Sequence, residues 1–182
     1  GSTDDVSLIV AGLSRYADSS AIIYHEYTHL LLRNAVRDLP VWLNEGIAEY
    51  FSTFTLRAGG REAEVGQPIP RHLAQLRDGF VPLAQLLAVD RSSDLYNEGT
   101  RRSIFYAESW ALAHYLLVGH PDGAGTVNRY LTAYAAGAPP GDALAAASGV
   151  ALKDLEVELR RYAARTRFSA ATVTLSEAVT VD

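Results

Sequence analysis

Hydrophobic residues recur at helical spacing over most of the chain. The first such segment begins after Asp18-Ser19-Ser20, a suitable helix N-cap, and runs to about Val36. A second covers roughly residues 41–54 after Pro40, which suits the first turn of a helix. Only residues 37–39 separate the two, so we expect the second helix to fold back over the first. Further helices are predicted at about residues 70–77, 82–88, 102–118, 123–136, 140–147 and 151–166.

Strand patterns are short and lie near the ends of this helical region. Residues 6–10 (VSLIV) predict an N-terminal strand, because β-branched side chains dominate them. Residues 53–69 hold two extended runs around Ala58-Gly59-Gly60, which is typical of a β-hairpin. Residues 168–182 return to a β-branched pattern and predict a strand or a tail, whereas residues 89–100 predict a loop. We find no internal repeat or interior linker, so we expect one mainly α (α+β) domain over residues 1–182.

Composition and charge exclude several classes of protein. With 182 residues, 48% of them hydrophobic, the chain can build one core. No apolar run approaches the roughly 18 to 20 residues of a membrane-spanning helix. The net charge of -5, without a basic stripe, argues against a nucleic-acid partner. The single Lys153 among 16 basic residues indicates a GC-rich, bacterial coding sequence.

The first residues bear on localisation. Gly1-Ser2 resembles the pair left after removal of a purification tag, and no signal-peptide pattern follows it. We therefore expect any targeting segment to precede residue 1, so an extracytoplasmic location stays open, as does the oligomeric state.

The candidate chemistry begins with the sequence HEYTH at residues 25–29, an HExxH pattern inside the first predicted helix. Residues four apart lie one turn apart on one helix face, so His25 and His29 can bind one ion together. The opposite side of this helix carries an apolar stripe, which we expect to be buried while the histidines face a cleft. The stripe consists of Ile23, Tyr27, Leu30 and Leu31.

The second helix supplies carboxylates one turn apart, Glu45 and Glu49, within WLNEGIAEY at residues 42–50. Because the chain has no cysteine, histidine and carboxylate are its strong metal ligands. A catalytic zinc site commonly has three protein ligands and an open position, and two histidines with one carboxylate form such a set. Glu45 completes the set, and Glu49 is then placed to accept the free ring N–H of a liganding histidine. The reverse assignment, with Glu49 on the metal, stays open from spacing, as does a reading of both glutamates as solvated residues.

These motifs resemble those of a known group of enzymes. HEYTH followed by WLNEGIAEYF is similar to the gluzincin peptidases, most closely the peptidase MA-like families, and to the aminopeptidase N family. The resemblance implies a zincin-like helical domain and favours Glu45 as the third zinc ligand. Residues 105–114 (FYAESWALAH) are similar to a YAxSWAL helix of the MA-like families, which extends the resemblance over residues 18–166. Fifteen residues separate His29 from Glu45, fewer than in thermolysin or the aminopeptidases, so the connection is shorter here.

The expected function is zinc-dependent hydrolysis of a peptide or protein substrate. Zn²⁺ would lower the pKa of bound water to about 7, and Glu26 would act as the general base. The oxyanion of the reaction needs a further donor, for which Tyr106 is the candidate and His114 the reserve. We expect His72 and His120, near helix ends, to be structural. Substrate specificity stays open. The sequence lacks a Gly-Ala-Met-Glu-Asn-type segment, with which aminopeptidase N members hold the free amine of a substrate. Exopeptidase action is therefore not assigned, and the choice between endopeptidase and exopeptidase stays open.

Two other functions fit the same residues. A catalytically inactive domain could keep the metal for stability or partner binding, although the retained Glu26 argues against this. A non-haem iron enzyme also uses two histidines and one carboxylate. The location of the histidine pair on a helix beside a glutamate favours zinc hydrolysis.

Overall fold

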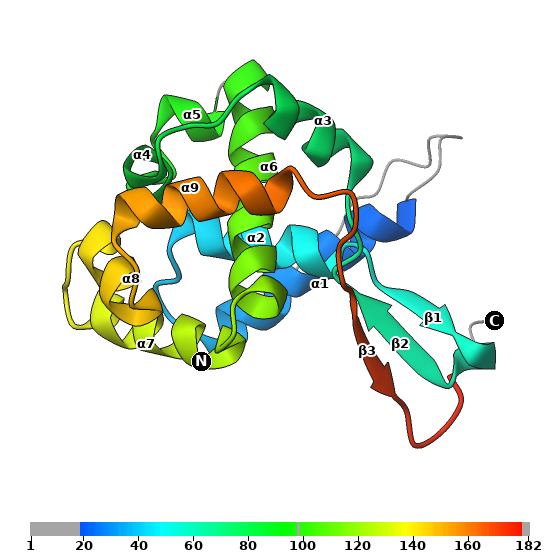
Figure 1. Cartoon of the computed structure of the whole chain (residues 1–182). Helices are drawn as coiled ribbons and strands as arrows, with labels where there is room; N and C mark the ends of the chain where they lie inside the picture. Colours follow the sequence, from blue (N-terminus) through cyan, green and yellow to red (C-terminus); the bar gives the residue numbers. More distant parts are fainter. Residues whose placement is uncertain (1–18, 98, 180–182) are drawn as a thin grey trace, which may run out of the picture.

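A computed structural model describes residues 19–97 and 99–179 and shows a mainly helical body with a small antiparallel sheet at its side (Figure 1). This confirms the predicted mainly α (α+β) class. The predicted strand at residues 6–10 and the Gly1-Ser2 pair lie outside the described residues. The helices are α1 (Ser19–Ala35), α2 (Val41–Phe51), α3 (Pro70–Asp78), α4 (Leu83–Leu87), α5 (Asp94–Asn97), α6 (Gly99–His114), the π-helical turn η2 (Tyr115–Gly119), α7 (Gly123–Ala135), α8 (Pro140–Ser148) and α9 (Leu152–Ala163).

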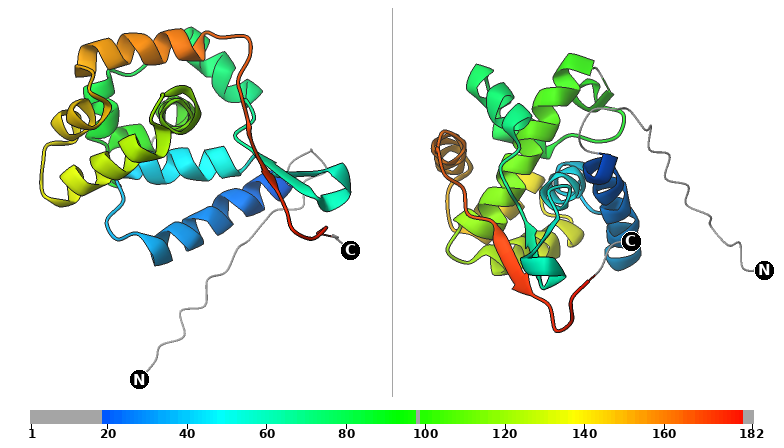
Figure 2. Two further views of the ribbon diagram at one scale, coloured as in Figure 1. Left: turned by 60° about the horizontal axis from the view of Figure 1, so that its bottom comes forward. Right: turned by 90° about the vertical axis from the view of Figure 1, so that its right-hand side faces the viewer.

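The link between α1 and α2 reverses the chain within a few residues. Asp38 takes a φ of 55°, a left-handed conformation that Asp tolerates better than most residues, and Pro40 precedes α2 in an extended conformation. As a result, α2 packs along α1 on one side and against α6, which crosses it, on the other (Figure 2). A Cβ at Gly46 would clash with the Ser109 carbonyl oxygen, so glycine permits this close approach of α2 to α6.

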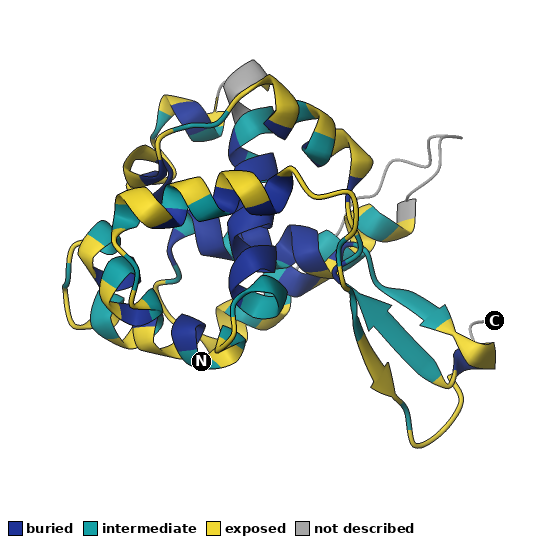
Figure 3. Ribbon diagram, viewed as in Figure 1, coloured by how far each residue is buried: buried dark blue, intermediate teal, exposed yellow. Residues whose placement is uncertain are grey.

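The core is centred on α2 and α6, and α4, α7, α8 and α9 add further fully buried side chains to it (Figure 3). Trp42 and Leu43 of α2 meet Phe105 and Trp110 of α6 in one hydrophobic cluster. The indole N–H of Trp42 donates to the Tyr130 hydroxyl at 3.1 Å, so this polar group is satisfied where it is buried. The helix with the predicted metal ligand is therefore anchored in the core.

The sheet consists of β1 (Thr55–Arg57), β2 (Glu62–Val65) and β3 (Ala171–Thr174) in the order β1-β2-β3, with both pairings antiparallel. The hairpin predicted at residues 53–69 is confirmed, with the short 3-10 turn η1 (Ala58–Gly60) between its strands. A strand also forms within residues 168–182, since Val173 of β3 pairs with Ala63. His114 joins this region to the helices, because its Nε2 donates to the Gly66 carbonyl and its Nδ1 accepts from the Tyr162 hydroxyl, both at 2.7 Å.

Two predictions about the helices were wrong. The segment 89–100 is not all loop, because it contains α5 and the start of α6. The apolar stripe of α1 is also not buried: Ile23 is 41% exposed, Tyr27 50% and Leu31 51%. The physical reason is that α2 packs against the histidine side of α1, and no described element covers the opposite side. No helix among the described residues has the length and apolar character to cross a membrane.

Candidate metal centre

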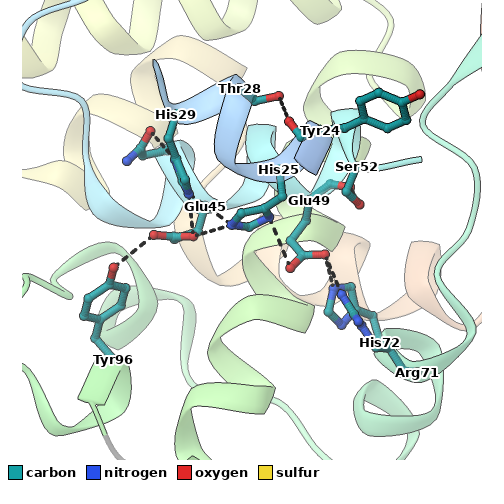
Figure 4. Close-up of polar contacts among 11 residues, drawn as sticks. Tyr24, His25, Thr28, His29, Glu45, Glu49, Ser52, Arg71, His72 and Tyr96 are labelled. Atoms are coloured by element: carbon teal, nitrogen blue, oxygen red, sulfur yellow. Dashed lines mark hydrogen bonds and ion pairs between the residues drawn. The ribbon is translucent and has the colours of Figure 1, made fainter. Parts of the chain in front are cut away.

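Three potential ligand atoms converge between α1 and α2 (Figure 4). The Nε2 atoms of His25 and His29 lie 3.0 Å apart, and each lies 3.4 Å from Glu45 Oε2. Nitrogen and oxygen ligands at about 2.0 to 2.1 Å from a tetrahedral zinc ion are about 3.3 Å from one another. The triangle thus has the dimensions of one face of such a coordination sphere, and these residues could hold a metal ion.

The contacts of Nδ1, the ring nitrogen that points away from the triangle, indicate the tautomer of each histidine. His29 Nδ1 lies 3.2 Å from Asn44 Oδ1, and His25 Nδ1 lies 3.5 Å from Glu49 Oε1. An amide or carboxylate oxygen only accepts, so these contacts suit a hydrogen on Nδ1 of each ring, and that tautomer directs the Nε2 lone pair inwards. Glu45 Oε2, which faces both lone pairs, is buried without a hydrogen-bond partner among the described residues. Three electron-pair donors therefore face one point, an arrangement that a cation stabilises.

The electrostatics of the cluster also favour positive charge at this point. Burial by itself raises the pKa of Glu45, but the close contacts with His25 and His29 and their charges outweigh it and lower that pKa to about 2. Burial likewise lowers the pKa of His29, but the close contact with Glu45 and its charge outweigh it, and the net pKa is raised. A positive charge between these three side chains is therefore stabilised, and a bound metal ion would supply one.

Helix α2 supplies three polar side chains that contact the two histidines. Glu45 faces both Nε2 atoms, while Asn44 and Glu49 contact the outer nitrogen of one ring each. The position of Glu49 agrees with the predicted role as acceptor from a liganding histidine. Its carboxylate faces Nδ1 of His25 rather than Nε2, so the geometry gives no support to the alternative in which it binds the metal. The sequence interpretation missed Asn44, for which the signal was its place directly before Glu45 on the same helix.

Glu26 and Tyr106 both lie close to the triangle. Glu26 is exposed, and its charge contributes to the raised pKa of His29. The Tyr106 ring of α6 stacks beside the His25 ring, with centroids 6.2 Å apart. The charge of Glu26 thus acts on one predicted ligand, and the Tyr106 ring lies beside the other. His114 does not join them, since it is fully buried and both of its ring nitrogens are bonded elsewhere.

Two further residues contact the cluster and were not predicted to do so. Tyr96 of α5 donates its hydroxyl to Glu45 Oε1 at 3.1 Å. His72, expected to be a structural residue at a helix start, does lie in the first turn of α3, but its Nε2 is 2.9 Å from Glu49 Oε2. The other such histidine, His120, contacts Thr126 and the Asp122 N–H and remains structural. No spacing in the sequence signals either Tyr96 or His72.

Comparison with known proteins gives one family. Residues 19–129 match the model of a family described as "Protein of unknown function (DUF1570)". No curated protein and no solved structure gives a significant match. The matched region contains α1, α2 and α6 and therefore every residue of the ligand triangle. Since it spans more than half of the 182 residues, the chain belongs to the DUF1570 family.

Proposed function

We propose that this protein is a zinc-dependent metallopeptidase of the gluzincin type, related to the peptidase MA-like families. The observation that carries the proposal is the triangle of His25 Nε2, His29 Nε2 and Glu45 Oε2, whose sides of 3.0 and 3.4 Å suit a tetrahedral ion. Imidazole nitrogen and carboxylate oxygen, without thiolate, match the ligand set of catalytic zinc in hydrolases.

A bound zinc ion supplies Lewis acidity, which polarises a peptide carbonyl and makes water acidic enough to lose its proton near neutral pH. Glu26 would take the proton of the attacking water, because it lies in the same helix turn as the ligands and is exposed to solvent. It would then deliver that proton to the leaving amine. Tyr106, beside His25, would donate a hydrogen bond to the carbonyl oxygen as negative charge develops on it.

The role of Glu26 separates this function from a metal site that serves stability alone. A structural site commonly closes its coordination sphere with protein ligands. Here three ligand atoms converge, and an exposed carboxylate stands close to one of the ligands. This combination supports hydrolysis rather than a purely structural metal.

The test combines metal analysis with a generic peptidase assay on the purified chain. We expect one equivalent of zinc and hydrolysis of peptides in a fluorescence-quenched library, lost with a chelator and restored by added zinc. The matched control is Glu26→Gln, which should stay folded and loaded with zinc but be inactive. Bound iron in place of zinc would point to the alternative of a non-haem iron enzyme. Zinc binding with library turnover no higher than that of Glu26→Gln would indicate an inactive metal-binding domain.

A further inference from the structure

Glu49 receives donors from two helices besides its own (Figure 4). One of its oxygens, Oε2, lies 2.9 Å from His72 Nε2 and 3.1 Å from Arg71 Nη2, both in the first turn of α3. Its other oxygen, Oε1, lies 3.5 Å from His25 Nδ1. The two oxygens thus have separate partners: α3 holds one, and the other is left for the histidine of α1.

Glu49 and His72 are both buried, so the contact between them is important for stabilising the Glu49 carboxylate. Glu49 is 5% exposed and His72 4%, so water does not screen their interaction. A buried carboxylate is strongly disfavoured unless hydrogen bonds compensate for its lost hydration. The His72 ring also packs against Trp110, with centroids 6.0 Å apart, which limits its movement. The side chain of Arg71 is 70% exposed, so its ion pair with Glu49 contributes less.

The two liganding histidines consequently have different outer partners. His29 faces the neutral amide of Asn44, whereas His25 faces a carboxylate that is itself held from α3. A carboxylate partner makes a liganding imidazole a stronger electron donor and fixes its ring orientation. Without its anchor on α3, Glu49 would be free to turn away from His25.

We propose that His72 is a positioning residue which, through Glu49, fixes His25 as a metal ligand. The contact chain runs from α3 to α2 to α1, and Arg71 supplements it at the surface. This inference rests on the proposed metal-binding function and extends it to a helix outside both motifs. It predicts that His72 controls metal affinity without touching the metal.

The experiment compares two amide variants that differ in reach. The side-chain nitrogen of Gln can occupy the place of His Nε2, whereas that of Asn is too short. Zinc affinity is measured by competition with a chromogenic chelator, and folding is checked by circular dichroism. We expect His72→Asn to weaken zinc binding about three- to tenfold, less than the 10- to 100-fold range for a direct partner of a ligand. His72→Gln should retain most of the affinity, and His120→Asn, at a histidine distant from the cluster, should retain all of it.

A double-mutant cycle with Glu49→Gln separates positioning from general stability. If His72 acts through Glu49, His72→Asn should add little further loss of zinc affinity in the Glu49→Gln background. The visible absorption spectrum of the cobalt-substituted protein, which reports on the ligand geometry, should shift in His72→Asn and return in His72→Gln. Unchanged affinity and spectrum in His72→Asn, or the same loss in both backgrounds, would overturn the inference while leaving the proposed function intact. A wild-type chain that binds neither zinc nor cobalt would overturn both.

Discussion

Tyr96 donates its hydroxyl hydrogen to Oε1 of Glu45 at 3.1 Å, and this leaves Oε2 of the same carboxylate facing the two histidines. The Tyr96 ring in turn stacks on Tyr106, with an interplanar angle of 13° and centroids 6.4 Å apart. Two phenols therefore stand at the candidate site with different contacts. Tyr96 restrains a ligand, while Tyr106 lies beside the ring of His25.

The two tyrosines should respond differently to loss of the hydroxyl. We expect Tyr106→Phe to lower the catalytic rate by roughly ten- to a thousand-fold with little change in zinc content, as loss of one oxyanion donor does. Tyr96→Phe should instead weaken zinc binding by about tenfold, because it frees a ligand carboxylate. Peptide hydrolysis and zinc competition, measured on both variants, check this. Full activity in Tyr106→Phe with a large loss in a folded His114→Ala variant would transfer the oxyanion role to the histidine.

Replacing Glu26 by Gln should abolish peptide hydrolysis and leave zinc bound. The amide keeps the size of the side chain but cannot accept the proton of water. Zinc content by mass spectrometry and turnover of a peptide substrate are the two measurements. A variant that loses its zinc would show that Glu26 belongs to the coordination sphere, contrary to its assignment as base.

The two glutamates of α2 should differ in their effect on metal affinity. Glu45→Ala removes an atom of the ligand triangle, whereas Glu49→Ala removes a contact with the far side of His25. We expect Glu49→Ala to weaken zinc binding about 10- to 100-fold and Glu45→Ala to weaken it far more. Chelator competition at fixed pH measures both. If Glu49→Ala proved the more damaging of the two, their roles would have to be exchanged.

The sequence predicted the ligand triangle because helix geometry is local. His25 and His29 are one turn apart, and the short link of residues 37–39 allowed Glu45 to fold back onto them. The same argument predicted that Glu49 contacts the ring nitrogen of a histidine that faces away from the metal. These contacts follow from spacing within two adjacent helices, so a single chain is enough to infer them.

Contacts made across the fold could not be inferred in this way. Tyr96 reaches Glu45 over 51 positions, and His72 reaches Glu49 over 23, and both depend on how α3 and α5 pack against the other helices. The prediction that the apolar stripe of α1 is buried was wrong for a related reason. Amphipathicity predicts that the apolar side is buried, but here polar side chains of α1 and α2 make the contact, and Ile23 and Tyr27 face outwards.

Glu108 introduces a pH dependence into the stability of the fold itself. It is fully buried in α6, where Oε2 accepts from the Val81 N–H at 2.8 Å and Oε1 has no partner among the described residues. Burial is the main cause that raises its pKa to about 8, and it outweighs the lowering by the Val81 hydrogen bond and by Arg160. The folded protein therefore holds a proton on Glu108 at neutral pH, whereas the unfolded chain, with a pKa near 4.5, does not.

The sign of the effect follows from proton binding. Between about pH 4.5 and pH 8 the folded state binds more protons than the unfolded state, so Glu108 makes the free energy of unfolding fall as pH rises through this window. Glu108→Gln keeps an oxygen acceptor for Val81 but has no proton to lose. It should therefore flatten this dependence and be more stable than wild type at pH 8 by at least about 1 kcal/mol, since one pKa unit corresponds to about 1.4 kcal/mol. Urea unfolding of both proteins from pH 5 to pH 9, with equal zinc, measures the difference. Parallel stability curves for wild type and Glu108→Gln across this range would show that Glu108 does not take up a proton on folding.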